Sequence, residues 1–264
     1  MELYLGNPMI IAKIIKPESS LYGVISKIFI PLKIIDKFEV VTWFAPWTTM
    51  AAGMAAKAGT SDRYTFWEFS SWDHGLISII ILIIAMIVLN INNYTILLEK
   101  DKITEKSEWI SRCILFFISW MLGWGITDIL SGIGWFFCYL PMILGIFLPY
   151  MVKLNDDNIT TFRKKIGFSS SILFLLSCFF GWILDDPVLA TASIVMFPFT
   201  IILAVTTHHR HIQRSHIYPL FIIMGFVIAR QGWFIFPSLF LFYLLRFYNY
   251  FIYKKVFPGF SVDQ

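Results

Sequence analysis

The chain is built from long apolar stretches that alternate with short polar ones. A helix that crosses a bilayer needs about 20 mostly apolar residues, and eight runs approach or exceed that length. They cover residues 40–58, 76–98, 109–129, 132–152, 166–184, 187–207, 217–230 and 233–253. Apolar and polar residues do not alternate over any long segment. The pattern therefore predicts an all-α polytopic membrane helix bundle with about eight transmembrane helices.

The two ends of the chain leave alternatives open. Only Gln231 and Gly232 separate the short seventh run from the eighth, so the last pair forms either two spans or one re-entrant element. Isoleucines near the N-terminus recur at helical spacing with lysines among them, which favours interfacial helices on the cytoplasmic leaflet. The other interpretation is that this N-terminal segment packs beneath the bundle. We expect interfacial helices at 1–36, the transmembrane bundle at 37–255 and a cytoplasmic tail at 256–264.

Composition and charge agree with a lipid-embedded chain. Hydrophobic residues make up 58% of the sequence and charged residues 14%, against about 25% charged in soluble domains. If the chain crosses the membrane eight times, both termini lie on the same side. Of the 21 Lys and Arg residues, only Lys57, Arg63 and Arg230 then lie on the other side of the membrane. The positive-inside rule then places both termini in the cytoplasm, in a cytoplasmic (inner) membrane of bacterial or archaeal type. The partner is the lipid bilayer, and no basic domain indicates a nucleic acid.

Three polar segments follow the second, fourth and sixth predicted spans. In the first, Asn90, Asn93 and Leu97 would share one helical face, with Asp101 one turn further. A helical face with amide side chains and a carboxylate at its end would help to bind a metal ion together with a phosphate headgroup. The alternative is a cluster of hydrogen bonds between helices, followed by a solvated run of charges.

The second segment contains Tyr150 and Lys153 and leads to the basic residues at 163–165. A basic loop at the bilayer surface attracts anionic headgroups or phosphates, although positive-inside topology alone also accounts for it.

The third segment, 206–216, holds four of the five histidines of the chain. Four interpretations remain open. It supplies metal ligands together with another helix, or an axial haem ligand, or Arg210, Arg214 and protonated imidazoles bind a diphosphate, or it is a polar loop. Haem is the least favoured ligand, because an axial histidine would have to face a cavity inside the bundle.

The order of these segments resembles the UbiA superfamily of intramembrane prenyltransferases. Those proteins are helical and carry an Asn/Asp-rich stretch after span two, a Tyr/basic loop after span four and an acidic stretch after span six. The matching segments are NYTILLEKDKIT at 93–104, FLPYMVK at 147–153 and WFAPW at 43–47, within a region of about 36–230. The chain resembles a divergent member with degenerate Asp-rich motifs, because Tyr94 and Leu97 replace two acids and no acid lies between Asp186 and Asp263.

The resemblance implies roles for particular residues. The catalytic set would be Asn93, Asp101, Arg210 and Arg214. The substrate-binding set would be Asn90, Tyr150, Lys153, His208, His209 and His211. Asn93 and Asp101 would be the metal ligands. In the family the acidic stretches hold Mg²⁺ against the diphosphate, so the loss of acids here implies an altered metal site with one Mg²⁺ at most.

The implied activity is transfer of an isoprenyl group from its diphosphate to a lipid-soluble acceptor. The main alternative is a non-catalytic relative that binds an isoprenoid or quinone, or serves as a structural subunit of a membrane complex. A haem- or metal-carrying subunit and a transporter are less favoured. Transport is weakest because no charged residue lies at the middle of a predicted span with an evident partner.

Overall fold

The computed structural model of the protein describes residues 10–37, 39–61, 72–99, 102, 104–151, 159–207 and 209–254. Within these residues the chain is helical and contains no extended strand. The helices divide into two compact units, one formed by residues 39–234 and the other by residues 1–38 together with 235–264. We call them the bundle unit and the terminal unit.

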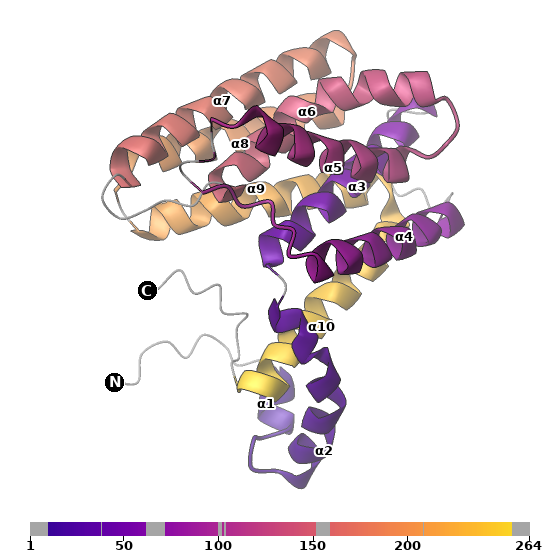
Figure 1. Ribbon diagram of the computed structural model, residues 1–264, viewed down its shortest axis with the longest axis vertical. Helices are drawn as coiled ribbons and strands as arrows, with labels where there is room; N and C mark the ends of the chain where they lie inside the picture. Colours follow the sequence, from indigo (N-terminus) through magenta and orange to yellow (C-terminus); the bar gives the residue numbers. More distant parts are fainter. Residues whose placement is uncertain are drawn as a thin grey trace. The chain divides into compact units, whose positions relative to one another are not determined.

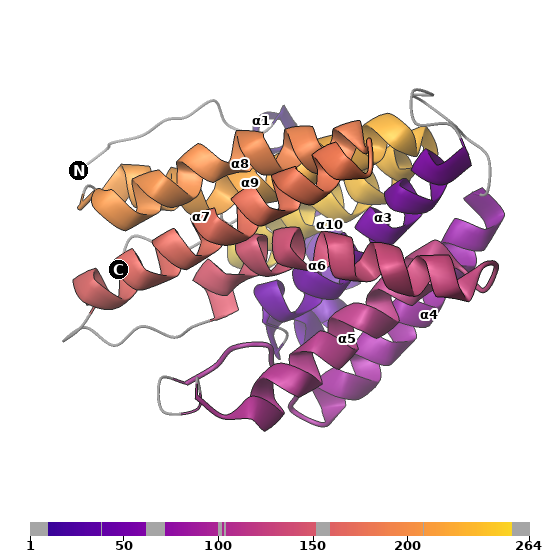
Figure 2. The same cartoon turned by 90° about the horizontal axis from the view of Figure 1, so that it is seen from above.

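Among its described residues the bundle unit contains seven long helices and the 3₁₀ turn η4 that follows the last of them. They are α3 (Val40–Ser61), α4 (Trp72–Ile91), α5 (Lys106–Trp124), α6 (Ile129–Met151), α7 (Ile159–Ile183), α8 (Pro187–Val205), α9 (His209–Arg230) and η4 (Gly232–Phe234). Helix α3 contacts α4, α5, α6 and α9, whereas α7 packs along α6 and α8. Figures 1 and 2 show that α4, α6 and α8 run in one direction, so their C-terminal ends face the same end of the unit.

Each predicted span of the bundle unit corresponds to one of its helices, but several boundaries differ. The second run was expected to continue to residue 98, and this is wrong, because α4 ends at Ile91. The third predicted span corresponds to α5, which ends at Trp124. The next residue, Gly125, adopts a φ of 89°, which residues with a side chain rarely adopt. The seventh is longer than expected, since α9 begins at His209 and passes through Pro219.

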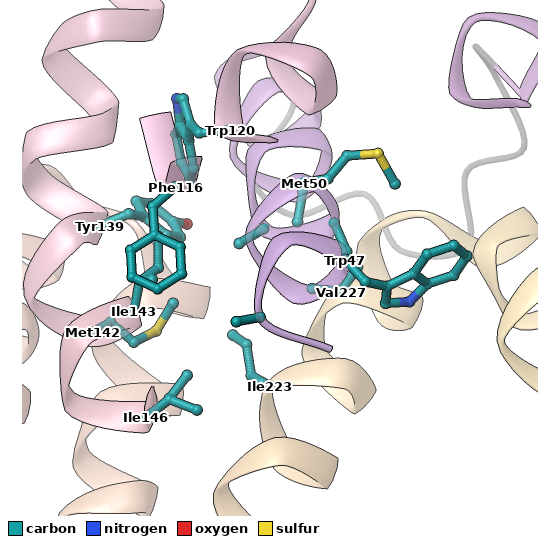
Figure 3. Close-up of a cluster of buried hydrophobic side chains, with 14 of the residues drawn as sticks. Trp47, Met50, Phe116, Trp120, Tyr139, Met142, Ile143, Ile146, Ile223 and Val227 are labelled. Atoms are coloured by element: carbon teal, nitrogen blue, oxygen red, sulfur yellow. The ribbon is translucent and has the colours of Figure 1, made fainter. Parts of the chain in front are cut away.

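Buried side chains of α3, α5, α6 and α9 pack together in the core of the bundle unit (Figure 3). Trp120 of α5 is fully buried, and its indole N–H donates to the carbonyl oxygen of Gly132 at 2.9 Å. The centroid of its ring lies 5.0 Å from the ring centroid of Tyr139. Helices α3 and α5 approach so closely that a Cβ on Gly123 would lie 1.9 Å from the carbonyl oxygen of Met50. The glycine is therefore required for this contact between the two backbones.

Among the described residues, five helices have the length and the apolar composition to cross a membrane. They are α4, α6, α8, the Arg163–Ile183 part of α7, and Gly232–Tyr253, which contains α10. Helix α4 leaves Ile77, Ile84 and Val88 more than half exposed, as expected of a surface that faces lipid. The prediction of a helical polytopic membrane chain is confirmed at this level, and the count of eight spans and the position of the termini stay predictions.

The terminal unit joins the N-terminal segment to the last helix. It contains α1 (Ile10–Ile14), α2 (Ser20–Phe29), η1 (Ile30–Lys37) and α10 (Ile235–Tyr253). A small apolar cluster holds it together, with Tyr22 of α2 packed against Tyr250 and Phe251 of α10. The predicted interfacial segment is thus helical, and it is attached to the C-terminal end of a candidate membrane span.

Candidate functional site

The asparagine run after α4 forms a helix stop. The N–H of Tyr94 donates to the carbonyl oxygen of Leu89, and the N–H of Asn93 donates to that of Asn90. Together with the φ of 57° at Asn93, these two bonds define a Schellman motif. Asparagine is one of the few residues that tolerates this left-handed conformation. The expected helical face of Asn90, Asn93 and Leu97 does not form, because the chain leaves the helix before residue 93.

An open cleft of about 460 Å³ lies beside this helix stop. Its described walls come from the end of α4, the following loop and the first turns of α5. The lining residues are Leu89, Asn92, Asn93, Tyr94, Thr95, Leu97, Glu99, Lys102, Glu108, Ser111 and Arg112. The exposed residues Asn93, Glu99 and Lys102 therefore line the same cleft.

Arg112 is the buried cation of this cleft, with 3% of its surface exposed. Its guanidinium donates to a Glu108 carboxylate oxygen at 2.6 Å and to the carbonyl oxygens of Ile96 at 2.9 Å and Leu97 at 3.1 Å. It also reaches the carbonyl oxygen of Thr95 at 3.3 Å. With its donors directed to these acceptors, Arg112 shapes the loop and has little capacity left for a phosphate.

A second set of polar contacts fixes the same loop to the start of α3. The hydroxyl of Thr42 donates to a carboxylate oxygen of Glu39 at 2.6 Å, and Thr95 also donates to that carboxylate. The N–H of Ile96 in turn donates to the hydroxyl oxygen of Thr42 at 3.1 Å. One wall of the cleft is thereby tied to α3 as well as to α5.

Burial changes the acid–base behaviour of one residue in the cleft. The pKa of Tyr94 is raised above its ordinary value, mainly because burial disfavours the phenolate. Ser111 and Arg112 act in the opposite direction, and the carboxylate of Glu108 reinforces the rise. The Tyr94 phenol is therefore neutral at physiological pH, and its hydroxyl oxygen is buried in the wall of the cleft.

The second polar segment adjoins the first. The N–H of Leu98, at the end of the cleft loop, donates to the carbonyl oxygen of Met151 at the end of α6. Tyr150 is half-buried one residue before that carbonyl group. Lys153 lies outside the described residues. The structure therefore brings the cleft loop and the end of α6 together, as the order of the polar segments suggests.

The third polar segment begins α9. His209 is the first residue of this helix and His211 is exposed on its first turn. The backbone places Arg210 and Arg214 on one side of the helix, four residues apart. His208 lies outside the described residues, as do the side chains of His209, Arg210 and Arg214. The described walls of the cleft include no residue of α9.

Few of the described side chains are placed so that they could ligate a metal ion. Among the described residues, no three His, Cys, Asp or Glu side chains gather as a metal site would require. Asp101, one of the two expected ligands, lies outside the described residues. Among the described lining residues, Asn92, Asn93 and Glu99 are exposed and carry side-chain oxygens, whereas the carboxylate of Glu108 is bound by Arg112. This set suits at most one Mg²⁺ that keeps several waters and shares phosphate oxygens.

The opposite end of the bundle unit holds a polar cluster that sequence reasoning missed. The guanidinium of Arg230 lies 3.2 Å from a carboxylate oxygen of Asp186, and both residues are at most 2% exposed. The hydroxyl of Tyr139 donates to Asp186 at 2.6 Å, and Arg230 donates to the carbonyl oxygen of Ala55 at 3.2 Å. The two charges are 44 positions apart, so neither spacing nor composition indicates the pair.

Comparison with known proteins adds no assignment. No protein-family model matches the chain, and no curated protein or solved structure is significantly similar to it.

Proposed function

We propose that the chain is an integral protein of a cytoplasmic membrane, with both termini in the cytoplasm, that transfers an isoprenyl group from its diphosphate to a lipid-soluble acceptor. The observation that carries the proposal is the convergence of polar segments at one end of the bundle unit. The chain leaves α4, α6 and α8 at this end, and the Leu98–Met151 backbone bond joins the first two segments directly. The positive-inside rule assigns this end to the cytoplasm.

The proposed chemistry needs a cationic environment for the diphosphate. The bond between the allylic C1 and the diphosphate oxygen breaks, and the diphosphate leaves with the bonding electron pair. The acceptor forms a bond to C1 and releases a proton to water. Arg210 and Arg214, with the neighbouring histidines, would bind the leaving diphosphate. Asn93, Glu99 and Asp101 would hold one Mg²⁺, which supplies further charge neutralisation when bound.

The test uses purified protein in nanodiscs with labelled farnesyl or geranylgeranyl diphosphate and an extract of membrane lipids as acceptor. We expect release of diphosphate and labelled lipid product, and loss of both in the Arg210→Gln/Arg214→Gln variant. Lys57→Gln is the matched control, because Lys57 lies near the C-terminal end of α3, whereas the cleft loop contacts the N-terminal end of this helix. Absence of turnover with every allylic diphosphate, with or without Mg²⁺, contradicts the transferase.

A non-catalytic isoprenoid-binding protein is the second candidate, and one observation favours it. Arg112, the buried cation of the cleft, is engaged by Glu108 and by loop carbonyl oxygens rather than directed at a ligand. Retention of a labelled isoprenoid or quinone without turnover supports this candidate. Failure to bind any of these lipids contradicts both.

A further inference from the structure

Helix α2 in the terminal unit has three distinct sectors. Tyr22, Ile25 and Phe29 pack in the apolar cluster with α10. Leu21, Val24 and Ile28 share an adjacent sector and are 53%, 59% and 68% exposed. Gly23 and Lys27 lie on the third sector, which is exposed and polar. We call Leu21, Val24 and Ile28 the outer apolar sector.

The level of α2 along α10 is set by direct contacts. The hydroxyl of Tyr22 donates to the carbonyl oxygens of Tyr250 at 2.8 Å and Phe251 at 3.1 Å, in the last turn of α10. The ring of Phe29 stacks on that of Phe251 with centroids 5.4 Å apart. Since α10 belongs to a candidate membrane span, α2 is held at the end of that span, where the hydrocarbon meets the headgroups.

The charges of this unit are predominantly positive. Within the described residues of this unit, four exposed lysines lie on α2 or on the segments next to it in the sequence: Lys13, Lys16, Lys27 and Lys33. Glu18 is exposed among them. The carboxylate of Asp36 accepts hydrogen bonds from Tyr248 and Tyr253 of α10. An exposed apolar sector in a unit rich in exposed lysines suits a surface that has an apolar interior and negatively charged headgroups.

We propose that α2 is a membrane-surface helix that inserts its outer apolar sector among the lipids of an anionic leaflet, while its lysines contact lipid phosphates. The terminal unit would thereby recognise anionic phospholipids independently of any transferase activity. The proposal requires that α10 spans the membrane and makes no use of the cleft or of the segment at 206–216.

The test compares two neighbouring positions on α2 in the full chain. Cys113, Cys138 and Cys178 are replaced by Ser, and an environment-sensitive fluorophore is attached at Val24→Cys or at Gly23→Cys. A side chain at Gly23 would meet no atom within 4 Å, so this position is the matched control. Nanodiscs contain phosphatidylcholine alone or phosphatidylcholine with phosphatidylglycerol.

We expect the Val24 probe to show blue-shifted emission and quenching by doxyl-labelled lipids, more strongly with phosphatidylglycerol. The Gly23 probe should emit as in water and be quenched by iodide. Replacement of Lys13, Lys16, Lys27 and Lys33 by Gln should remove the dependence on phosphatidylglycerol.

Three results overturn the proposal. They are a water-like Val24 probe in both lipids, emission that does not respond to phosphatidylglycerol, and an apolar probe that doxyl lipids do not quench. The last result would mean that a protein segment or a second copy of the chain covers the sector. Should the labelled variants fail to fold, amide hydrogen exchange of α2 in the parent chain decides, since the proposal requires slower exchange in anionic nanodiscs.

Discussion

Arg230 at the end of α9 and Asp186 before α8 form an ion pair that is almost completely removed from solvent, with a nitrogen–oxygen separation of 3.2 Å. Asp186 also accepts the N–H groups of Val188 and Leu189 and so caps α8. The hydroxyl of Tyr139 completes the surroundings of the carboxylate. Because Arg230 also donates to the carbonyl oxygen of Ala55, the pair connects α3, α6, α8 and α9 at the end of the bundle unit opposite the cleft.

Removal of either charge should destabilise the protein strongly. Breaking a buried pair from one side typically costs about 3–5 kcal/mol, because the remaining charge is left without its partner. Arg230→Met and Asp186→Asn should each lower the midpoint of thermal unfolding in detergent, and the double variant should lose less than the sum. Lys165→Met, at an exposed position of α7, is the control. Additive losses in the double variant would show that the two charges do not interact.

Gly59 makes room for the same guanidinium. A Cβ at this position would lie 2.0 Å from a terminal nitrogen of Arg230, which cannot move without leaving Asp186 or Ala55. Gly59→Ala should therefore destabilise the fold by about 1–3 kcal/mol, as is typical of overpacking. Gly23→Ala in α2 is the matched control and should be stabilising by about 0.5–1 kcal/mol, because the site is open and helical. Equal unfolding midpoints for the two variants would contradict this packing argument.

Substitutions of Asn93 separate its structural role from its proposed chemical role. Asn93→Gly should preserve stability, since glycine adopts a φ of 57° freely, whereas Asn93→Ala should cost about 1 kcal/mol. If the Asn93 amide also contacts diphosphate or metal, both variants should bind labelled isoprenyl diphosphate more weakly than the parent. Unfolding and equilibrium binding are measured on the same preparations. Parent-like binding by a stable Asn93→Gly protein would restrict Asn93 to ending α4.

Tyr94 should make the stability of the protein fall at alkaline pH. Its pKa is raised in the folded state, so its contribution is fully present below the ordinary pKa of about 10 and is lost as pH rises toward the folded value. Tyr94→Phe removes the ionisable group and should flatten the decline in unfolding midpoint above pH 10. Profiles of the same slope in the two proteins would refute the assignment.

The hydrophobic pattern alone predicts most of the helices. Apolar runs of about 20 residues are a strong signal, because a bilayer leaves few alternatives to a helix. The boundaries follow from local backbone chemistry that such a scan does not contain. At Asn93 the left-handed conformation ends α4, although apolar residues continue to Leu98. At His209 the polar sequence resembles a loop, yet it forms the first turns of α9.

The candidate site was predictable only in part. The order of polar segments along the chain predicts that the Asn93 loop and the C-terminal end of α6 lie at the same end of the bundle. The structure joins the two through the hydrogen bond between Leu98 and Met151. The use of Arg112 could not be foreseen, since its acceptors are mostly backbone carbonyl groups, which have no signature in the sequence. The Arg230–Asp186 pair was missed because contacts between distant residues depend on how the helices pack.

The contacts of Arg112 also affect how a ligand would meet the cleft. One guanidinium holds consecutive carbonyl groups of the loop, Glu39 and Thr42 hold its other side, and Leu98 is bonded to α6. A wall supported from three helices is already in place before anything binds. Little conformational freedom remains to be lost on association, so changes in affinity among cleft variants should report the contacts themselves rather than the cost of ordering a loop.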